Sequence, residues 1–475
     1  MYVHPLRNGL APTVDCCDVA RVTIDTLPDI ALLIIFDFYV DIEEWHWRTL
    51  VHVCQQWRNV IFGSPRRLNL RLHCRASTPV RETLDVWPPL PIAIWDYWDE
   101  ILGMDNIGAA LEQNDRIREL QLLDIPSSQF GIAWAGIQQP FPALTRLHLQ
   151  ARHDTAPVDP DLFLGGTAPR LQTLILEHIS FPGLTKLLLS ASHLVCLDLW
   201  EIPHSGYISP KAMVICLSTL TRLESLNIGL ESPRIRPDRR SRSPTPLTRI
   251  ILPVLNKLRF TGVSEYLEDL VARIDSPLLD KCHITFFHQL IFDTPQLSQF
   301  INRTPKLKTH NEAYVLFYFW AISVTLPQTL NGALQLEVLC RQPDWQLSSL
   351  AQLCSSSLSE TLIPMVEHLY IRSELPQRRW QDDVESGQWL ELLHPFTGVK
   401  DLYASREIAP GIAPAIQELV GERVTEVLPA LQGLFIEEPL PSGPVQETIG
   451  RFLNARHLVG RPIAVSHWER KKFEI

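Results

Sequence analysis

The stretch "PALTRLHL" at residues 142–149 has close copies along the chain, and these copies decide the fold. They are "PRLQTLIL" at 169–176, "PVLNKLRF" at 253–260, "PLLDKCHI" at 277–284 and "PALQGLFI" at 429–436. In each copy, apolar residues lie two, five and seven positions after the proline. The last two alternate with a residue that faces the other way, as in a β-strand with one buried face. The stretches therefore predict equivalent strands, each begun by a proline that needs no ladder hydrogen bond.

Copies without the proline fill the gaps, as in "IRELQLLDI" at 117–125 and "LVCLDLWEI" at 194–202. Equivalent central residues recur at intervals of 23 to 32 residues: Leu120, Leu147, Leu174, Leu197, Leu226, Leu258 and Cys282. Intervals of this size are typical of leucine-rich repeats. Helix-period segments lie between several strands; one follows Ser209, a predicted N-cap, and Pro210 in the first turn.

Repeated strand–helix units bury each other and form a curved solenoid. The chain therefore resembles the leucine-rich-repeat family, with an α/β fold in which a curved parallel sheet lies inside and helices lie outside. The asparagine position typical of these repeats is absent, and the register is lost between Cys282 and Leu369, through "HNEAYVLFYFWAISV" at 310–324. We expect irregular units there.

A second feature is the apolar stretch "TLPDIALLIIFDFYV" at residues 26–40. Asp29 and Asp37 bracket only seven uncharged residues, whereas a membrane-spanning helix needs about 20 and a signal peptide needs a basic flank. The sequence therefore predicts no membrane segment. A helix that is apolar on more than one face is buried by its own domain on one side and by a partner on the other.

Residues 27–70 continue this stretch and resemble an F-box: Leu-Pro, then Ile-Phe, then Leu-x-x-Val-Cys-x-x-Trp-Arg ending at Arg58. The resemblance implies an all-helical domain that binds the Skp-type linker of a cullin-RING (SCF-type) ubiquitin ligase. It assigns the linker contact to Leu27, Pro28, Ile35, Phe36, Leu50, Val53, Cys54 and Trp57, the last four on one expected helix. Ile30 and Ile34 replace residues that are often acidic in the family, and Gln55-Gln56 replaces a basic pair. Cys54 is expected to be a small buried apolar residue and not a nucleophile.

The resemblances divide the chain into an N-terminal tail (1–22), an F-box (23–75) and a leucine-rich-repeat-like domain (76–475). A net charge of -10 and a pI near 5.9 argue against a nucleic-acid partner. Nine scattered cysteines suggest neither a disulfide framework nor a zinc site, and favour a cytoplasmic or nuclear protein.

The segment "SPRIRPDRRSRSPTPLTR" at 232–249 has no apolar period, and we expect a disordered basic loop. Ser243-Pro244 and Thr245-Pro246 are alternative sites for proline-directed phosphorylation, and a nuclear import signal is a further alternative. Earlier in the chain, "PIAI" at 91–94 is expected to form an opening strand. Three tryptophans around it, Trp87, Trp95 and Trp98, are expected to belong to the core or the cap and not to a ligand cage.

Alternation along the strands also predicts which side chains face solvent on the concave side. The pairs are Arg146 and His148, Thr173 and Ile175, Asp198 and Trp200, Ser225 and Asn227, Lys257 and Arg259, Lys281 and His283, and His368 and Tyr370. Because several pairs are basic, we hypothesise that this face binds an acidic or phosphorylated segment of a protein. The predicted substrate-binding residues are Arg146, His148, Trp200, Lys257, Arg259, Lys281, His283, His368 and Tyr370. The alternative is a solvated face with no dominant ligand.

The sequence contains no catalytic motif of the GxSxG, HExxH, Walker or GxGxxG type, and no His/Cys cluster with metal-ligand spacing. We therefore expect no enzyme activity, no cofactor and no metal. The resulting hypothesis is a substrate adaptor that holds an unknown target protein beside a ubiquitin-conjugating enzyme for ubiquitin-dependent degradation. The alternative is a leucine-rich-repeat scaffold without a ligase link.

Overall fold

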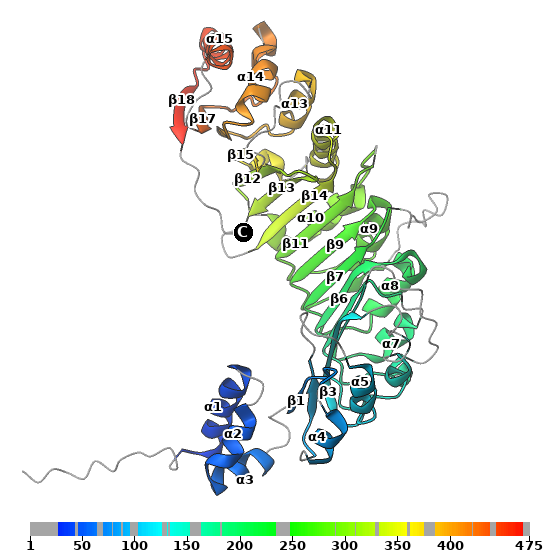
Figure 1. The fold of residues 1–475 in the computed structure, drawn as a ribbon. Coiled ribbons are helices and arrows are strands. Elements are labelled where there is room, and N and C mark those ends of the chain that lie inside the picture. The colour runs from blue at the N-terminus through cyan, green and yellow to red at the C-terminus, as the bar shows by residue number, and fades with distance from the viewer. Residues whose placement is uncertain are drawn as a thin grey trace, which may run out of the picture. The chain divides into compact units, whose positions relative to one another are not determined.

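A computed structural model describes most of the chain (Figure 1). The described residues are 27–42, 46–63, 70–77, 79–86, 89–95, 103–125, 131, 134–152, 163–180, 183–233, 248–289, 291–308, 310–327, 332–358, 362–374, 385–419, 421–437 and 443–468. The predicted tail, most of the predicted basic loop, Trp87 and Trp98 lie outside these residues. The chain divides into two compact units, residues 1–71 with 86–92 and residues 72–85 with 93–475.

The helices of the first unit are α1 (Asp29–Ile42), α2 (His46–Val53) and α3 (Gln55–Gly63). Pro28 directly precedes α1, and its carbonyl accepts hydrogen bonds from the amides of Ala31 and Leu32. The rings of Phe36 and Trp57 are 4.7 Å apart in the core. The single helix expected over residues 50–57 is wrong, because the helix breaks at Cys54. The Cys54 sulfur there accepts the amide of Trp57 at 3.4 Å, as a cap of α3 does.

The second unit is a leucine-rich-repeat-like α/β solenoid, as predicted, with a long, mostly parallel sheet. Among the described residues the sheet has 16 strands in the order β1-β2-β3-β4-β5-β6-β7-β9-β11-β14-β13-β12-β15-β16-β17-β18. The strands before the irregular region are β1 (Leu70–Leu72), β2 (Ile92–Ile94), β3 (Ile117–Ile125), β4 (Arg146–Ala151), β5 (Thr173–Glu177), β6 (Cys196–Ile202), β7 (Ser225–Leu230), β9 (Lys257–Gly262) and β11 (Lys281–Phe287). Those after it are β15 (His368–Ser373), β16 (Asp401–Ala404), β17 (Gly433–Glu437) and β18 (Ala464–Trp468). Strand β2 is the strand expected at "PIAI".

The register of the parallel strands confirms the repeat. Leu120 pairs with Leu147, Leu147 with Leu174, and the row continues without a slip through Leu197, Leu226, Leu258 and Cys282. All seven side chains are almost completely buried. Each repeat therefore contributes one side chain to a continuous core row, which no single repeat could bury alone.

Helices cover the other side of this core row, and in Figure 1 α7, α8 and α9 lie along one side of the strands. The helices are α4 (Val80–Val86), α5 (Met104–Leu111), α7 (Leu184–Ser190), α8 (Pro210–Leu217), α9 (Ser264–Val271), α10 (Pro295–Arg303), α11 (Pro343–Leu353), α13 (Ser386–Leu393), α14 (Ala409–Gln417) and α15 (Pro444–Leu458). The predicted start of α8 is confirmed, since the Ser209 hydroxyl accepts the amide of Ala212. We call the opposite face of the sheet the concave face.

The irregular region reverses the order of three strands: β12 (Glu312–Phe317), β13 (Ala321–Pro327) and β14 (Ala333–Leu339). Strand β14 lies beside β11 in parallel, whereas β13 is antiparallel to both β14 and β12. Strand β12 then pairs in parallel with β15, with Ala313 opposite Leu369. The loss of repeat register between Cys282 and Leu369 thus corresponds to a hairpin inserted into the parallel sheet.

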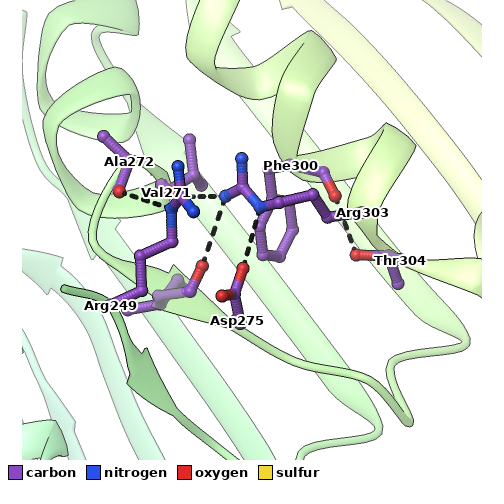
Figure 2. Close-up of polar contacts among 8 residues, drawn as sticks. Arg249, Val271, Ala272, Asp275, Phe300, Arg303 and Thr304 are labelled. Carbon is purple, nitrogen blue, oxygen red and sulfur yellow. Dashed lines mark hydrogen bonds and ion pairs between the residues drawn. The ribbon is translucent and has the colours of Figure 1, made fainter. Parts of the chain in front are cut away.

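A small parallel ladder joins β8 (Ile250–Ile251) to β10 (Ile274–Asp275), outside the main sheet. Figure 2 shows how arginines fix this region: Arg303 contacts the Asp275 carboxylate at 2.8 Å and donates to the carbonyl of Val271. Arg249, at the end of the predicted basic loop, donates to the carbonyl of Ala272 at 3.2 Å. The chain is therefore anchored to the α9–β10 connection where that predicted loop ends.

Truncation of a side chain in the core row tests this packing. We expect Leu226→Ala to lower the free energy of unfolding by about 3 kcal/mol, because it leaves a cavity between two repeats. Leu189→Ala, at an exposed position of α7, should change it by less than about 1 kcal/mol. Urea denaturation followed by circular dichroism measures both values. Equal effects of the two substitutions would contradict a continuous buried row.

Candidate functional site

Helix α1 has two apolar faces, as its sequence predicts. Leu32, Leu33 and Phe36 are buried against α2 and α3. Ile30, Ile34 and Ile35 are 54%, 55% and 44% exposed. Large aliphatic side chains exposed side by side on one helix mark an interaction surface.

The residues predicted to contact the linker fall into two groups. Pro28, Ile35 and Val53 are exposed, and Leu27 and Cys54 are half-buried. Phe36, Leu50 and Trp57 are buried within the unit, so they support the exposed apolar residues from the core and do not form the surface themselves. Sequence reasoning counted Ile30 and Ile34 as departures from the family, yet they extend the exposed apolar face.

A shallow depression on the same unit is lined by Asp29, Gln55, Gln56, Asn59, Val60 and Gly63. The pair Gln55-Gln56, which differs from the family pattern, thus belongs to this largely polar depression.

On the concave face, the sheet register brings four of the predicted substrate-binding residues together. Lys281 lies opposite Lys257, and His283 lies opposite Arg259, on adjacent strands. Arg146 and His148 lie four strands away on β4, and His368 and Tyr370 lie four strands away on β15. At about 4.8 Å per strand, the nine residues form separate groups and not one site.

Carboxylates that sequence reasoning missed lie beside the histidines of this face. His148 contacts Glu177 at 3.1 Å, His283 contacts Glu337 at 3.2 Å, and His368 contacts Asp401 at 3.0 Å. Glu177 could have been found by extending the alternation of its strand by one step. Glu337 could not, because it belongs to the reversed region.

Unlike these histidines, the cations Lys257, Lys281 and Arg259 do not contact a carboxylate among the described residues. Lys257 and Lys281 are exposed and Arg259 is half-buried. Among the described residues, none of the three has a carboxylate within salt-bridge distance. We call these three residues the cationic cluster.

Asp198 is the carboxylate nearest to this cluster in the register. It accepts a hydrogen bond of 2.7 Å from the Asn227 amide. Burial raises the pKa of Asp198 above its ordinary value, against the opposing effects of Asn227, Arg259 and Lys257. Keeping the Asp198 side chain ionised in the folded protein therefore costs desolvation free energy.

Two predicted aromatic contacts prove to be packed within the sheet. A Cβ atom at Gly229 would lie 2.9 Å from the Trp200 ring, so that ring fills the space above Gly229. Tyr370 stacks between Tyr314 and Tyr403, with ring centroids 4.5 and 4.3 Å away, and Phe435 continues the ladder. Such cross-strand pairs stabilise the sheet. Sequence reasoning missed the ladder because Tyr314 comes from the reversed region.

The described residues contain no group of three or more His, Cys, Asp or Glu side chains that could hold a metal ion. Burial raises the pKa of the Cys282 and Cys354 thiols to about 12, which disfavours the reactive thiolate. In the part of the chain that the structure describes, no helix is both long and apolar enough to cross a membrane.

Comparisons with known proteins give limited information. No family model and no curated protein matches the chain. A leucine-rich repeat-containing protein, LegL7 from Legionella pneumophila, is 13% identical, with 84% of this chain and 99% of that chain covered and a TM-score of 0.28. The yeast Rad7 and Elc1 complex matches at 14% identity, with 88% and 91% covered and a TM-score of 0.27. Scores this low support no functional inference.

The raised pKa of Asp198 predicts a pH-dependent stability. The cost of ionising this carboxylate in the folded state appears as the pH rises above the ordinary value of 3.8. Asp198→Asn keeps a hydrogen-bond acceptor for Asn227 and removes the charge. Relative to the parent, the variant should therefore become more stable as the pH rises from about 4 to 7, as measured by urea denaturation. Asp115→Asn, at an exposed site, controls for the change in net charge. A gain that shrinks with rising pH would contradict the prediction.

Proposed function

We propose that the chain is the substrate-recognition subunit of an SCF-type cullin-RING ubiquitin ligase. In this proposal the helical unit binds the Skp-type linker, and the solenoid holds a target protein. The single observation that supports it best is the second apolar face of α1, formed by Ile30, Ile34 and Ile35.

This face has the character expected of an interface. The three helices described in this unit bury little of their own surface. Apolar area that a partner covers would contribute about 25 cal/mol per Å² to the free energy of binding. Because Phe36 and Trp57 already lie in the core, the linker would gain its energy from Ile35, Val53 and their neighbours on the surface. The proposal thus places the contact on fewer of the resembling residues than the sequence pattern did.

The adaptor itself performs no chemistry in this proposal. Holding a target beside a charged ubiquitin-conjugating enzyme makes ubiquitin transfer effectively intramolecular. The cysteines, of which Cys282 and Cys354 are buried, take no part. A leucine-rich-repeat scaffold without a ligase link is the second candidate, and it shares the solenoid but not the linker.

Binding of the Skp-type linker by the full chain tests the first arm of the proposal. We expect Ile35→Asp/Val53→Asp to weaken binding by at least roughly 30-fold, or about 2 kcal/mol, because it puts two charges into an apolar contact. Ile215→Asp, at an equally exposed position of α8, should bind like the parent. Isothermal titration calorimetry measures each affinity. If the parent chain does not bind the linker, the scaffold candidate takes over.

The solenoid would hold its target through the cationic cluster. Lys257, Arg259 and Lys281 come from two adjacent strands, and the half-buried Ser225 on β7 lies opposite Lys257. Asn227, predicted to face solvent, is buried and its amide is already bound to Asp198, so it adds no free donor. The exposed Lys257 and Lys281, which have no carboxylate within salt-bridge distance among the described residues, favour acidic or phosphorylated segments. The flanking histidines His148 and His368 already contact carboxylates, which would limit the site to these strands.

Charge reversal tests this second arm. A peptide of aspartate and glutamate with one phosphoserine serves as the probe, followed by fluorescence anisotropy. We expect Lys257→Glu/Lys281→Glu to weaken binding roughly tenfold or more, because repulsion replaces two attractions. Lys186→Glu/Lys211→Glu changes the net charge equally on helices α7 and α8 and should have little effect. Equal losses in both variants would mean that only the net charge matters, and would contradict a local site.

A further inference from the structure

We infer that the reversed-strand region carries a second docking surface, which fits a basic protein segment with apolar anchor residues. The surface consists of Phe319, Trp320, Trp345 and Ile291, and we call it the aromatic edge. It lies at the ends of β12 and β14, whereas the cationic cluster lies near the starts of β9 and β11, and it does not depend on the proposed function.

The composition of this edge sets it apart within the second unit. Phe319, Trp320 and Trp345 are 57%, 63% and 44% exposed, and they are the only exposed Phe or Trp side chains among the described residues of that unit. All three come from the reversed hairpin or from the helix that follows it. Exposed aromatic residues that gather in one place mark interaction sites, and Trp is enriched at the centres of interfaces.

The backbone beneath the edge is fixed by hydrogen bonds. Trp320 lies in the turn between β12 and β13, and its carbonyl accepts the amide of Cys340 at 2.8 Å. The buried Gln346 amide donates to the carbonyls of Tyr318, Ala321 and Cys340. One side chain thus ties the turn, the end of β14 and the start of α11 together. A surface held in this way loses little conformational entropy when a partner binds.

Helix α11 and the segment after β11 extend the edge. Trp345 stacks on His288 with centroids 4.7 Å apart and planes 6° apart, and still leaves its outer side exposed. The Gln352 side chain, two helical turns further along, accepts the amide of Phe292 at 3.1 Å. These two contacts place His288 and Phe292 beside α11, and the exposed Ile291 directly precedes Phe292.

The charges around the edge specify the partner. Among the described residues of these strand-end segments, Asp293, Asp344 and Glu374 are acidic and Arg341 is basic. Glu374 is placed by its amide, which donates to Phe317 at the end of β12, and Asp344 is close enough to act on His288. An acidic rim attracts lysine and arginine. It repels an identical rim, so the partner is not a second copy of this chain.

Two peptides with the same leucine and phenylalanine residues test the inference, one with lysines between them and one with glutamates. Fluorescence anisotropy with the full chain is expected to show binding of the lysine peptide only. Phe319→Ser/Trp320→Ser should weaken that binding roughly tenfold or more. Leu189→Ser/Ile215→Ser, which removes equally exposed apolar side chains from α7 and α8, should leave it unchanged. Asp344→Asn should weaken it less than the aromatic double variant does.

Several outcomes would overturn the inference. Unchanged affinity in Phe319→Ser/Trp320→Ser would show that the lysine peptide responds only to the net charge of the chain. Preference for the glutamate peptide would contradict the acidic rim. Sedimentation velocity that detects a dimer of the parent chain, lost in the same variant, would assign the edge to a second copy. Because the substituted side chains are exposed, an unchanged thermal midpoint is expected and confirms that loss of binding is local.

Discussion

The repeat domain depends on one row of buried side chains that stays in register across neighbouring strands. Leu120, Leu147, Leu174 and their successors pair strand by strand, and each is covered by the repeats on both sides. A slip of one residue in any strand would turn that side chain to solvent and bring a polar one into the core. This constraint fixes which side chains reach the concave face, and therefore fixes the cationic cluster.

Among the described strands, the hairpin formed by β12, β13 and β14 interrupts the parallel pairing. Strand β13 runs antiparallel between β14 and β12, so the turn at Phe319 and Trp320 lies at the end of the sheet where the parallel strands finish. The same reversal places Tyr314 opposite Tyr370 and completes the aromatic ladder. An insertion in the repeat thus creates one buried aromatic feature and one exposed one, with different consequences: the ladder stabilises the sheet, and the edge is free to bind.

The helical unit and the solenoid differ in how they bury their apolar side chains. Each solenoid repeat buries its apolar side chains against its neighbours in the chain. The helical unit has too few helices to do so, and the outer face of α1 remains exposed at Ile30, Ile34 and Ile35. The protein thus has three surfaces of different chemistry: apolar on the helical unit, cationic on the concave face and aromatic at the strand ends. Such a set suits a protein that binds several others.

The sequence alone determined what depends on local periodicity. Alternation with period two identified the strands and the residues of the core row, and the apolar run of α1 showed that the helix has more than one apolar face. Tertiary structure decided what depends on residues far apart in the chain. Glu337 contacts His283 from 54 residues away, and the order of β14, β13 and β12 follows from their packing and not from any local pattern. The break at Cys54 was missed because helical spacing continues across it. The period of the apolar residues predicts which face of a helix or strand is buried. Which strand lies next to it in the sheet depends on the packing of the whole fold.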